Sequence, residues 1–273
     1  MSEKKEKPEK KDIPVKTGKF DIEKIKHTGA VAVPSMFTLS NMGCGFFSVL
    51  SASEGDYVRA SWLIVFSYFM DLLDGRIARF LHGESPLGIE LDSFADWMSF
   101  GIAPAYMIFR MTLKDLGYMG YAIAFFYVLC GLLRLARFNL KAHFGESDHH
   151  NFQGLPIPGA AGIIIAIVLN YSLVEGMSEG VWATMMTWVF SSSAVIVSML
   201  ALLMVSSVPF PAFKGGMSMS SRLALVILTV VLVLFIGYPR ETLFIVFSGY
   251  VLYGVICGLV NMLKNLFKKE QQA

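Results

Sequence analysis

Long apolar segments separated by short polar ones fill the chain from residue 35 onward. A helix needs about 20 apolar residues to cross the roughly 30 Å hydrocarbon core of a bilayer, where lipid offers backbone groups no hydrogen-bond partners outside a helix. The pattern therefore predicts eight transmembrane helices, at residues 35–53, 60–80, 94–113, 116–136, 155–175, 183–206, 222–238 and 241–263. The sixth segment continues as far as Phe213 and the seventh is short, so a six-helix arrangement stays open.

The composition agrees with an all-α, polytopic integral membrane bundle. Hydrophobic residues make up 55% of the chain and charged residues 16%, with a mean hydropathy of +0.57, whereas soluble domains carry about 25% charge. These values exclude a water-soluble globule and a disordered chain, and nothing in them supports nucleic-acid binding. Cys44, Cys130 and Cys257 lie inside apolar segments without a CxxC pair, so neither a disulfide framework nor a zinc site is predicted.

The basic residues are distributed unevenly. Residues 1–27 hold nine lysines and six acidic residues without apolar periodicity. We expect residues 1–33 to form a disordered or amphipathic basic segment, 34–206 the membrane core, and 207–273 the C-terminal transmembrane helices with a basic tail. If eight helices alternate, 19 of the 23 Lys and Arg residues fall on one side. The positive-inside rule places this side, with both termini, in the cytoplasm, which predicts an integral protein of the cell (inner) membrane.

Four aspartates lie in or beside the second and third apolar segments: Asp71, Asp74, Asp92 and Asp96. Even on lenient scales a charge at mid-membrane costs about 2.5–3.5 kcal/mol, so these carboxylates need partners or a metal ion. Residues three or four apart share one face of a helix, and two antiparallel helices can therefore bring both pairs together. Carboxylates without Cys or His favour Mg²⁺, Mn²⁺ or Ca²⁺. The alternative is a hairpin in which Arg76 and Arg79 neutralise the acids, although two ion pairs leave at least two carboxylates uncompensated.

The same segment carries a signature. Residues 71–79 (DLLDGRIAR) and 88–96 (GIELDSFAD) resemble the signature of the CDP-alcohol phosphatidyltransferase family, with all eight invariant positions present. The resemblance implies transfer of a substituted phosphate from a CDP-linked lipid to an alcohol, with release of CMP, in a cytoplasm-facing cavity of the membrane. It also implies that Asp71, Asp74, Asp92 and Asp96 hold one or two Mg²⁺ or Mn²⁺ ions, and that Asp96 is the general base for the alcohol.

Further positions match the parts of the family that bind the CDP-lipid. Family members carry a Pro-Asn/Asp-x-x-Thr element at the first span, which here reads PSMFT over residues 34–38. Ser35 departs from the pattern, and Asn41, one helical turn beyond Thr38, is a second candidate. For Thr38 and Asn41, interhelical hydrogen bonding is the alternative. The CDP-lipid contacts that the resemblance implies are Pro34, Thr38, Asn41, Gly75, Ala78, Arg79, Ser85 and Gly88.

A later stretch bears on the acceptor alcohol. Residues 134–139 (RLARFN) and 152–158 (FQGLPIP), together with 92–104, resemble the branch of the family that makes phosphatidylserine. The resemblance implies CDP-diacylglycerol and L-serine as substrates, phosphatidylserine and CMP as products, and a homodimer in the membrane lipid. The carboxylate of serine needs a cation in a partly desolvated pocket, and Arg134 and Arg137 supply two. Arg134, Arg137, Asn139 and Gly154 form the predicted site for serine and phosphate.

Three alternatives to this assignment stay open. The two arginines can instead extend to anionic lipid headgroups. The same chemistry can use glycerol 3-phosphate or inositol as the acceptor. A cation carrier is the alternative from another class of protein, because aspartates inside a membrane can also move ions.

Overall fold

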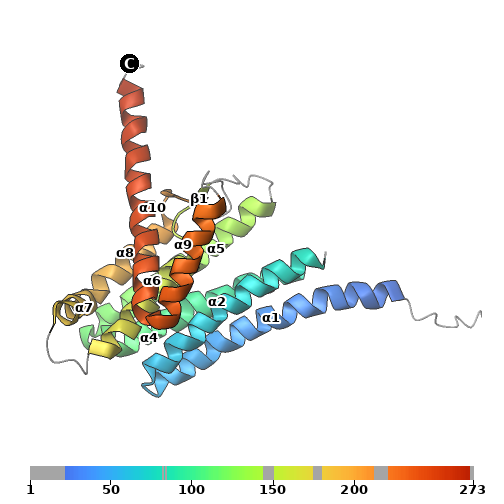
Figure 1. Cartoon of the computed structure of the whole chain (residues 1–273), viewed down its shortest axis with the longest axis horizontal. Coiled ribbons are helices and arrows are strands. Elements are labelled where there is room, and N and C mark those ends of the chain that lie inside the picture. Colours follow the sequence, from blue (N-terminus) through green and yellow to red (C-terminus); the bar gives the residue numbers. More distant parts are fainter. Residues whose placement is uncertain are drawn as a thin grey trace, which may run out of the picture.

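The computed structural model describes residues 22–81, 83, 85–143, 151–174, 180–211 and 221–270. Within these ranges all eight predicted segments lie in helical structure, which confirms the all-α fold class (Figure 1). A two-stranded antiparallel sheet joins residues 151–153 to 209–211 and was not predicted. The elements are α1 (Ile22–Ser53), α2 (Tyr57–Phe80), α3 (Pro86–Asp96), the π-helix η1 (Trp97–Ile102), α4 (Ala103–Met111), the 3₁₀-helix η2 (Leu113–Leu116), α5 (Tyr118–His143), β1 (Asn151–Gln153), α6 (Ile157–Val174), α7 (Val181–Ser191), α8 (Ser193–Val205), β2 (Pro209–Pro211), α9 (Ser221–Gly237) and α10 (Pro239–Glu270).

Three helical stretches in the described part of the chain are long and apolar enough to cross a membrane: Ala32–Ser53, Tyr118–Lys141 and Pro239–Val260. Helices α7 and α8 form a fourth candidate span, bent by 64° at the break between them. Helix α2 has a comparable length but carries the charged residues of the candidate site. The number of helices that span the bilayer, eight or six, therefore stays a prediction.

The first helix begins inside the predicted N-terminal segment. Helix α1 starts at Ile22, so residues 22–33 of that segment are helical, and the division of the chain at residue 33 stays a prediction. Residues 1–21, where most of the predicted basic segment lies, are outside the described residues.

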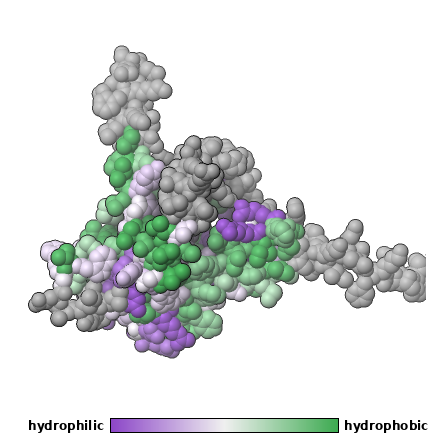
Figure 2. Space-filling view, in the orientation of Figure 1, coloured by the Kyte–Doolittle hydropathy of each residue, from purple (hydrophilic) through white to green (hydrophobic). Residues whose placement is uncertain are grey.

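In Figure 1, α1 and α2 form a long pair connected by a tight turn, and α10 runs steeply away from them. Hydrophobic surface lies along these helices in Figure 2, and hydrophilic surface gathers near the α1–α2 turn.

Helix α6 is the centre of the bundle. Every residue from Gly159 to Asn170 is buried, and helices α2, α5, α7, α8 and α10 all pack against α6. A helix that is apolar on all sides has no face suited to water and is stable only when surrounded by protein or lipid. Here protein surrounds it, so α6 forms the support on which the other helices are arranged.

A π-helical turn follows directly after Asp96. Helices α3, η1 and α4 form one continuous helical stretch, and its π-helical part is Trp97–Ile102. Such turns are rare and occur frequently at functional sites. Helix α1 crosses η1 at Gly45, where an added Cβ would lie 2.8 Å from the Ser99 Cα atom. The absent side chain at Gly45 is therefore what allows α1 to approach the turn that follows Asp96.

We predict that Gly45→Ala destabilises the protein by about 1–3 kcal/mol, because the new methyl group overlaps the Ser99 backbone. Gly43→Ala is the matched control, since no atom lies within 4 Å of a Cβ placed there and alanine favours a helix over glycine. Thermal unfolding of the two variants in detergent measures the difference. Equal melting temperatures would show that α1 does not need this close approach.

Candidate active site

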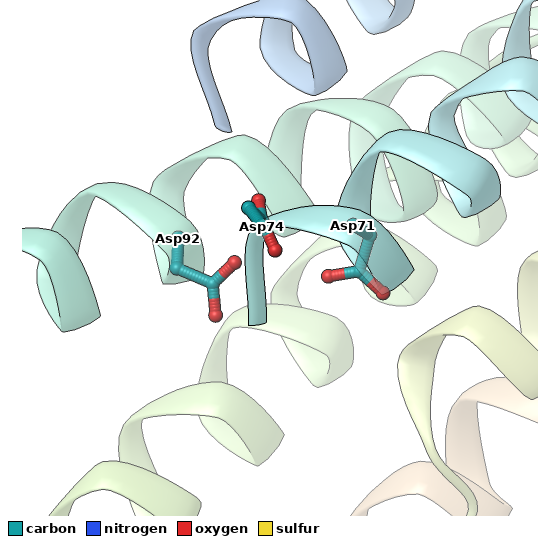
Figure 3. A group of neighbouring side chains, drawn as sticks. All are labelled: Asp71, Asp74 and Asp92. Atoms are coloured by element: carbon teal, nitrogen blue, oxygen red, sulfur yellow. The ribbon is translucent and has the colours of Figure 1, made fainter. Parts of the chain in front are cut away.

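Three aspartates converge between α2 and α3. Asp71 and Asp74 lie three residues apart on α2, and Asp92 lies on α3, and their carboxylates point into a common space (Figure 3). One carboxylate oxygen from each lies within 4.8 Å of those of the other two. The hairpin is closed by Ser85, whose hydroxyl accepts a hydrogen bond from the Gly88 amide at 3.0 Å and thereby caps the start of α3. The convergence predicted from the sequence is thus present for these three residues.

Two oxygen atoms of the cluster lack hydrogen-bond donors among the described residues. Asp74 is 4% exposed, and Asp74 Oδ2 and Asp92 Oδ1 are buried without a hydrogen-bond partner among the described residues. Burying a charge without compensation is costly, and an all-oxygen ligand set is what hard divalent cations prefer. The three residues therefore fit a divalent metal ion.

The alternative of a self-neutralised hairpin finds no support in this part of the structure. Arg76 and Arg79 are both exposed. The Arg79 Nε atom donates to the Gly75 carbonyl at 2.9 Å, one turn earlier on the same helix. No ion pair between either arginine and the aspartate cluster is present among the described residues. The carboxylates are therefore left for another cation.

Asp96 lies one turn beyond Asp92, at the end of α3, and outside the group of three. Its carboxyl group interacts with that of Asp71, and its Oδ1 atom accepts a hydrogen bond from the Asn41 side-chain amide at 3.3 Å. Asp96 thus adjoins the cluster and is also held by a hydrogen bond from Asn41 of α1. This position is compatible with a role as a base beside a metal site.

Helix α1 supplies the polar side chains that face the hairpin. The Thr38 hydroxyl lies beside the Asp74 carboxylate and donates to the Pro34 carbonyl at 3.2 Å. Pro34, Thr38 and Asn41 are all buried. Pro34 lies inside α1, and proline has no backbone N–H to donate. One backbone hydrogen bond of the helix is therefore missing at Pro34.

The remaining CDP-lipid positions lie next to the turn between α2 and α3. Gly75, Ala78 and Arg79 lie in the last two turns of α2, and nothing lies within 4 Å of a Cβ placed on Gly75. A Cβ on Gly88 would lie 3.1 Å from the Ser85 hydroxyl oxygen. Gly88 therefore keeps the start of α3 free for the capping hydrogen bond.

The four residues predicted to bind serine separate into two groups. Arg134 is half-buried, interacts electrostatically with Asp96 and lies over the Phe138 ring at 5.7 Å from its centroid. The Asn139 amide donates to the Ser93 hydroxyl at 2.9 Å, which joins α5 to α3 beside Asp92. These two residues adjoin the aspartate hairpin.

Arg137 and Gly154 instead meet at the end of α8. The Arg137 guanidinium donates to four backbone carbonyls, at 3.0–3.4 Å, belonging to Gln153, Met204, Val205 and Ser206. The last carbonyls of a helix have no partner within it, so Arg137 satisfies the end of α8. Gly154 has a φ of +84°, and a Cβ there would lie 3.1 Å from the Arg137 Nη2 atom. Glycine at position 154 therefore permits both the left-handed backbone conformation and the close approach of the Arg137 guanidinium.

Two tyrosines near the site were missed. The Tyr68 hydroxyl donates to the Pro158 carbonyl, and Tyr68 lies close to Asp71 and Asp96. Its place three residues before Asp71 on one helix face could have indicated it. Tyr250 of α10 interacts electrostatically with Arg134, and no motif in the sequence marks it.

Comparison with known proteins identifies the family. The family model of CDP-alcohol phosphatidyltransferases matches residues 31–192, and the chain belongs to this family. A CDP-diacylglycerol–serine O-phosphatidyltransferase of Helicobacter pylori is 34% identical over 243 residues, which are 88% of this chain and 96% of that protein. The protein of the same name from Bacillus subtilis is 32% identical over 182 residues, 67% of this chain and 91% of its own length.

An archaetidylserine synthase of Methanothermobacter thermautotrophicus is also similar, at 33% identity over 195 residues, 70% of this chain and 74% of that protein. Enzymes of the family depend in general on a divalent metal ion, and the aspartate cluster is a group that can hold one. The apolar helices and the family together define an integral membrane protein.

We predict that Asp92→Asn weakens Mn²⁺ binding by about tenfold or more, because one anionic ligand is lost from an all-oxygen site. Glu90→Gln is the matched control, since Glu90 lies two residues earlier on α3 and is exposed. Mn²⁺ titration followed by electron paramagnetic resonance measures both variants. An unchanged affinity in Asp92→Asn would exclude Asp92 as a ligand.

We predict that Arg137→Ala lowers the stability by about 1.5–3 kcal/mol, because a charged donor to four carbonyls is lost. Arg59→Ala removes an exposed arginine near the start of α2 and serves as the control. Thermal unfolding in detergent compares them. If both variants melt like the wild type, Arg137 does not stabilise the end of α8.

Proposed function

We propose that this protein is a CDP-diacylglycerol–serine O-phosphatidyltransferase, which forms phosphatidylserine and CMP. The observation that carries the proposal is the buried aspartate cluster, with its unpartnered oxygens, beside Asp96. The family to which the chain belongs supports the reaction class. The match to the Helicobacter pylori enzyme over 96% of its length supports serine as the acceptor.

The reaction is a direct displacement at phosphorus. The serine hydroxyl oxygen forms a bond to the phosphorus that carries the diacylglycerol, and the bond from that phosphorus to the CMP oxygen breaks. Asp96 takes the hydroxyl proton, as a general base within hydrogen-bonding reach of the nucleophile does. Asp71, Asp74 and Asp92, with Asp96 as a fourth carboxylate, would hold Mg²⁺ or Mn²⁺, which when bound would stabilise the charge that develops on the leaving CMP.

The other residues bind and orient the two substrates. Arg134 offers its guanidinium to the serine carboxylate beside Asp96, which suits the planar donor group of arginine. Arg137, Asn139 and Gly154 hold the surrounding elements in place. The proposed contacts with the CDP-lipid are Pro34, Thr38, Gly75, Ala78, Arg79, Ser85 and Gly88.

The location and assembly also belong to this proposal. The excess of Lys and Arg on one side of the eight-helix arrangement supports a site and both termini that face the cytoplasm. We place the protein in the cell (inner) membrane, as a homodimer.

We predict that the purified full-length protein releases CMP from CDP-diacylglycerol only when L-serine and Mg²⁺ or Mn²⁺ are present. Asp96→Asn should lower kcat by about 10²–10⁴-fold, the range that a positioned base contributes. Asp115→Asn changes an exposed acid in η2 and should keep the wild-type rate. Release with glycerol 3-phosphate or inositol in place of serine would overturn the acceptor but keep the reaction class. Ion flux into liposomes without CMP release from any alcohol would favour the cation carrier.

A further inference from the structure

Asn41 connects α1 to the proposed base. Its side chain is fully buried, and its Nδ2 atom donates to Asp96 Oδ1 at 3.3 Å. Among the described residues, this hydrogen bond reaches Asp96 from outside the α2–α3 hairpin. The family resemblance groups Asn41 with the CDP-lipid contacts, whereas the geometry directs its amide at Asp96.

The backbone of Asn41 is held from two other elements. Its carbonyl oxygen accepts hydrogen bonds from the Ser99 hydroxyl at 2.8 Å and the Ser67 hydroxyl at 3.3 Å. Ser99 lies in the π-helical turn, at the point where Gly45 allows α1 to approach. Helices α1 and α2 and the turn η1 therefore meet at Asn41, which fixes where its side chain begins.

The orientation of the amide leaves one polar atom unsatisfied. A carboxylate oxygen only accepts hydrogen bonds, so the NH₂ group of Asn41 must face Asp96. The Oδ1 atom of Asn41 is consequently buried without a partner among the described residues. An unsatisfied buried acceptor destabilises the folded state. A ligand with an N–H or O–H donor would remove this cost.

We propose that Asn41 is the positioning residue of Asp96, and that its Oδ1 atom accepts a hydrogen bond from a donor group of the acceptor other than the attacking hydroxyl, which in serine is the ammonium group. This inference rests on the proposed function and deepens it. The amide holds Asp96 Oδ1 and thereby fixes the orientation of the carboxylate that takes the proton. The same side chain then places the acceptor next to the base. A cytosine amino group offers the same N–H chemistry, and the experiment below separates the two sources.

Steady-state kinetics of Asn41→Leu, with serine and CDP-diacylglycerol varied separately, test the proposal. Loss of a hydrogen bond to a charged group is expected to lower kcat by about 10–100-fold. The KM for serine should rise by more than about threefold, while the KM for CDP-diacylglycerol and the Mn²⁺ affinity stay within about twofold. If the leucine variant does not fold, Asn41→Ser replaces it, because the shorter serine side chain cannot reach Asp96. This variant should show the same lowered kcat and raised KM for serine, with the KM for CDP-diacylglycerol unchanged.

Asn170→Leu is the matched control. Asn170 is also fully buried in a helix with an unpartnered Oδ1, but its amide donates to the Ala166 and Arg240 carbonyls. Its kinetic constants should equal those of the wild type in the folded fraction.

Three results would overturn the inference. Wild-type kinetics in both Asn41 variants would exclude any role, and an unchanged serine KM would exclude contact with the acceptor. A raised KM for CDP-diacylglycerol at an unchanged kcat would assign Asn41 to the nucleotide instead. Failure of the proposed function is distinguishable, because it appears as absence of serine-dependent CMP release in the wild type. If another alcohol supports release, its KM replaces that of serine in the same test.

Discussion

Burial of several carboxylates among apolar helices is the constraint on which the rest of this structure depends. Asp71, Asp74 and Asp92 lie close enough to repel one another, and in a low-dielectric environment that repulsion is strong. The polypeptide tolerates the arrangement only if neighbouring elements hold the hairpin in place and a cation completes it. Helix α1 provides polar contacts to the hairpin, and the apolar helix α6 packs against α2.

Helix α1 illustrates how a membrane helix can meet this demand. One face carries small or polar residues at helical spacing: Pro34, Thr38, Asn41, Gly45 and Ser48, all of which are buried. The opposite face exposes large apolar side chains such as Met36, Leu39 and Phe47. Small and polar residues at helix interfaces are typical of membrane proteins, where close backbone approach and hydrogen bonds drive association. The same face therefore packs α1 and supplies contacts to the acids.

Much of this organisation is readable in the sequence, because it depends on local spacing. The helical segments follow from runs of apolar residues, and the convergence of Asp71, Asp74 and Asp92 follows from pairs on adjacent helices joined by a short turn. The position of Asp96 outside the group of three does not follow from this spacing, and neither does its hydrogen bond from Asn41 of α1. The π-helical turn itself has no marker in the spacing of apolar residues.

Arg134 and Arg137 have different contacts that their spacing in the sequence does not predict. They lie three residues apart on α5, so the sequence treats them as a pair, yet one guanidinium interacts with Asp96 and the other binds the carbonyls at the end of α8. The difference comes from the pairing of β1 with β2, which brings Gln153 and the segment after α8 to Arg137. Contacts between segments so distant in the chain leave no periodic signal.

The outer face of the hairpin explains how buried chemistry can act on a lipid. Leu72 is 50% exposed and Phe80 is 82% exposed, although both lie on α2 close to the aspartates. An amphipathic substrate can therefore place its diphosphate at the acids while its acyl chains stay in the bilayer beside α2. A soluble enzyme would need a hydrophobic channel for those chains. In a membrane protein the lipid itself fills that role, so the hairpin needs only one polar face and one face that lipid can cover.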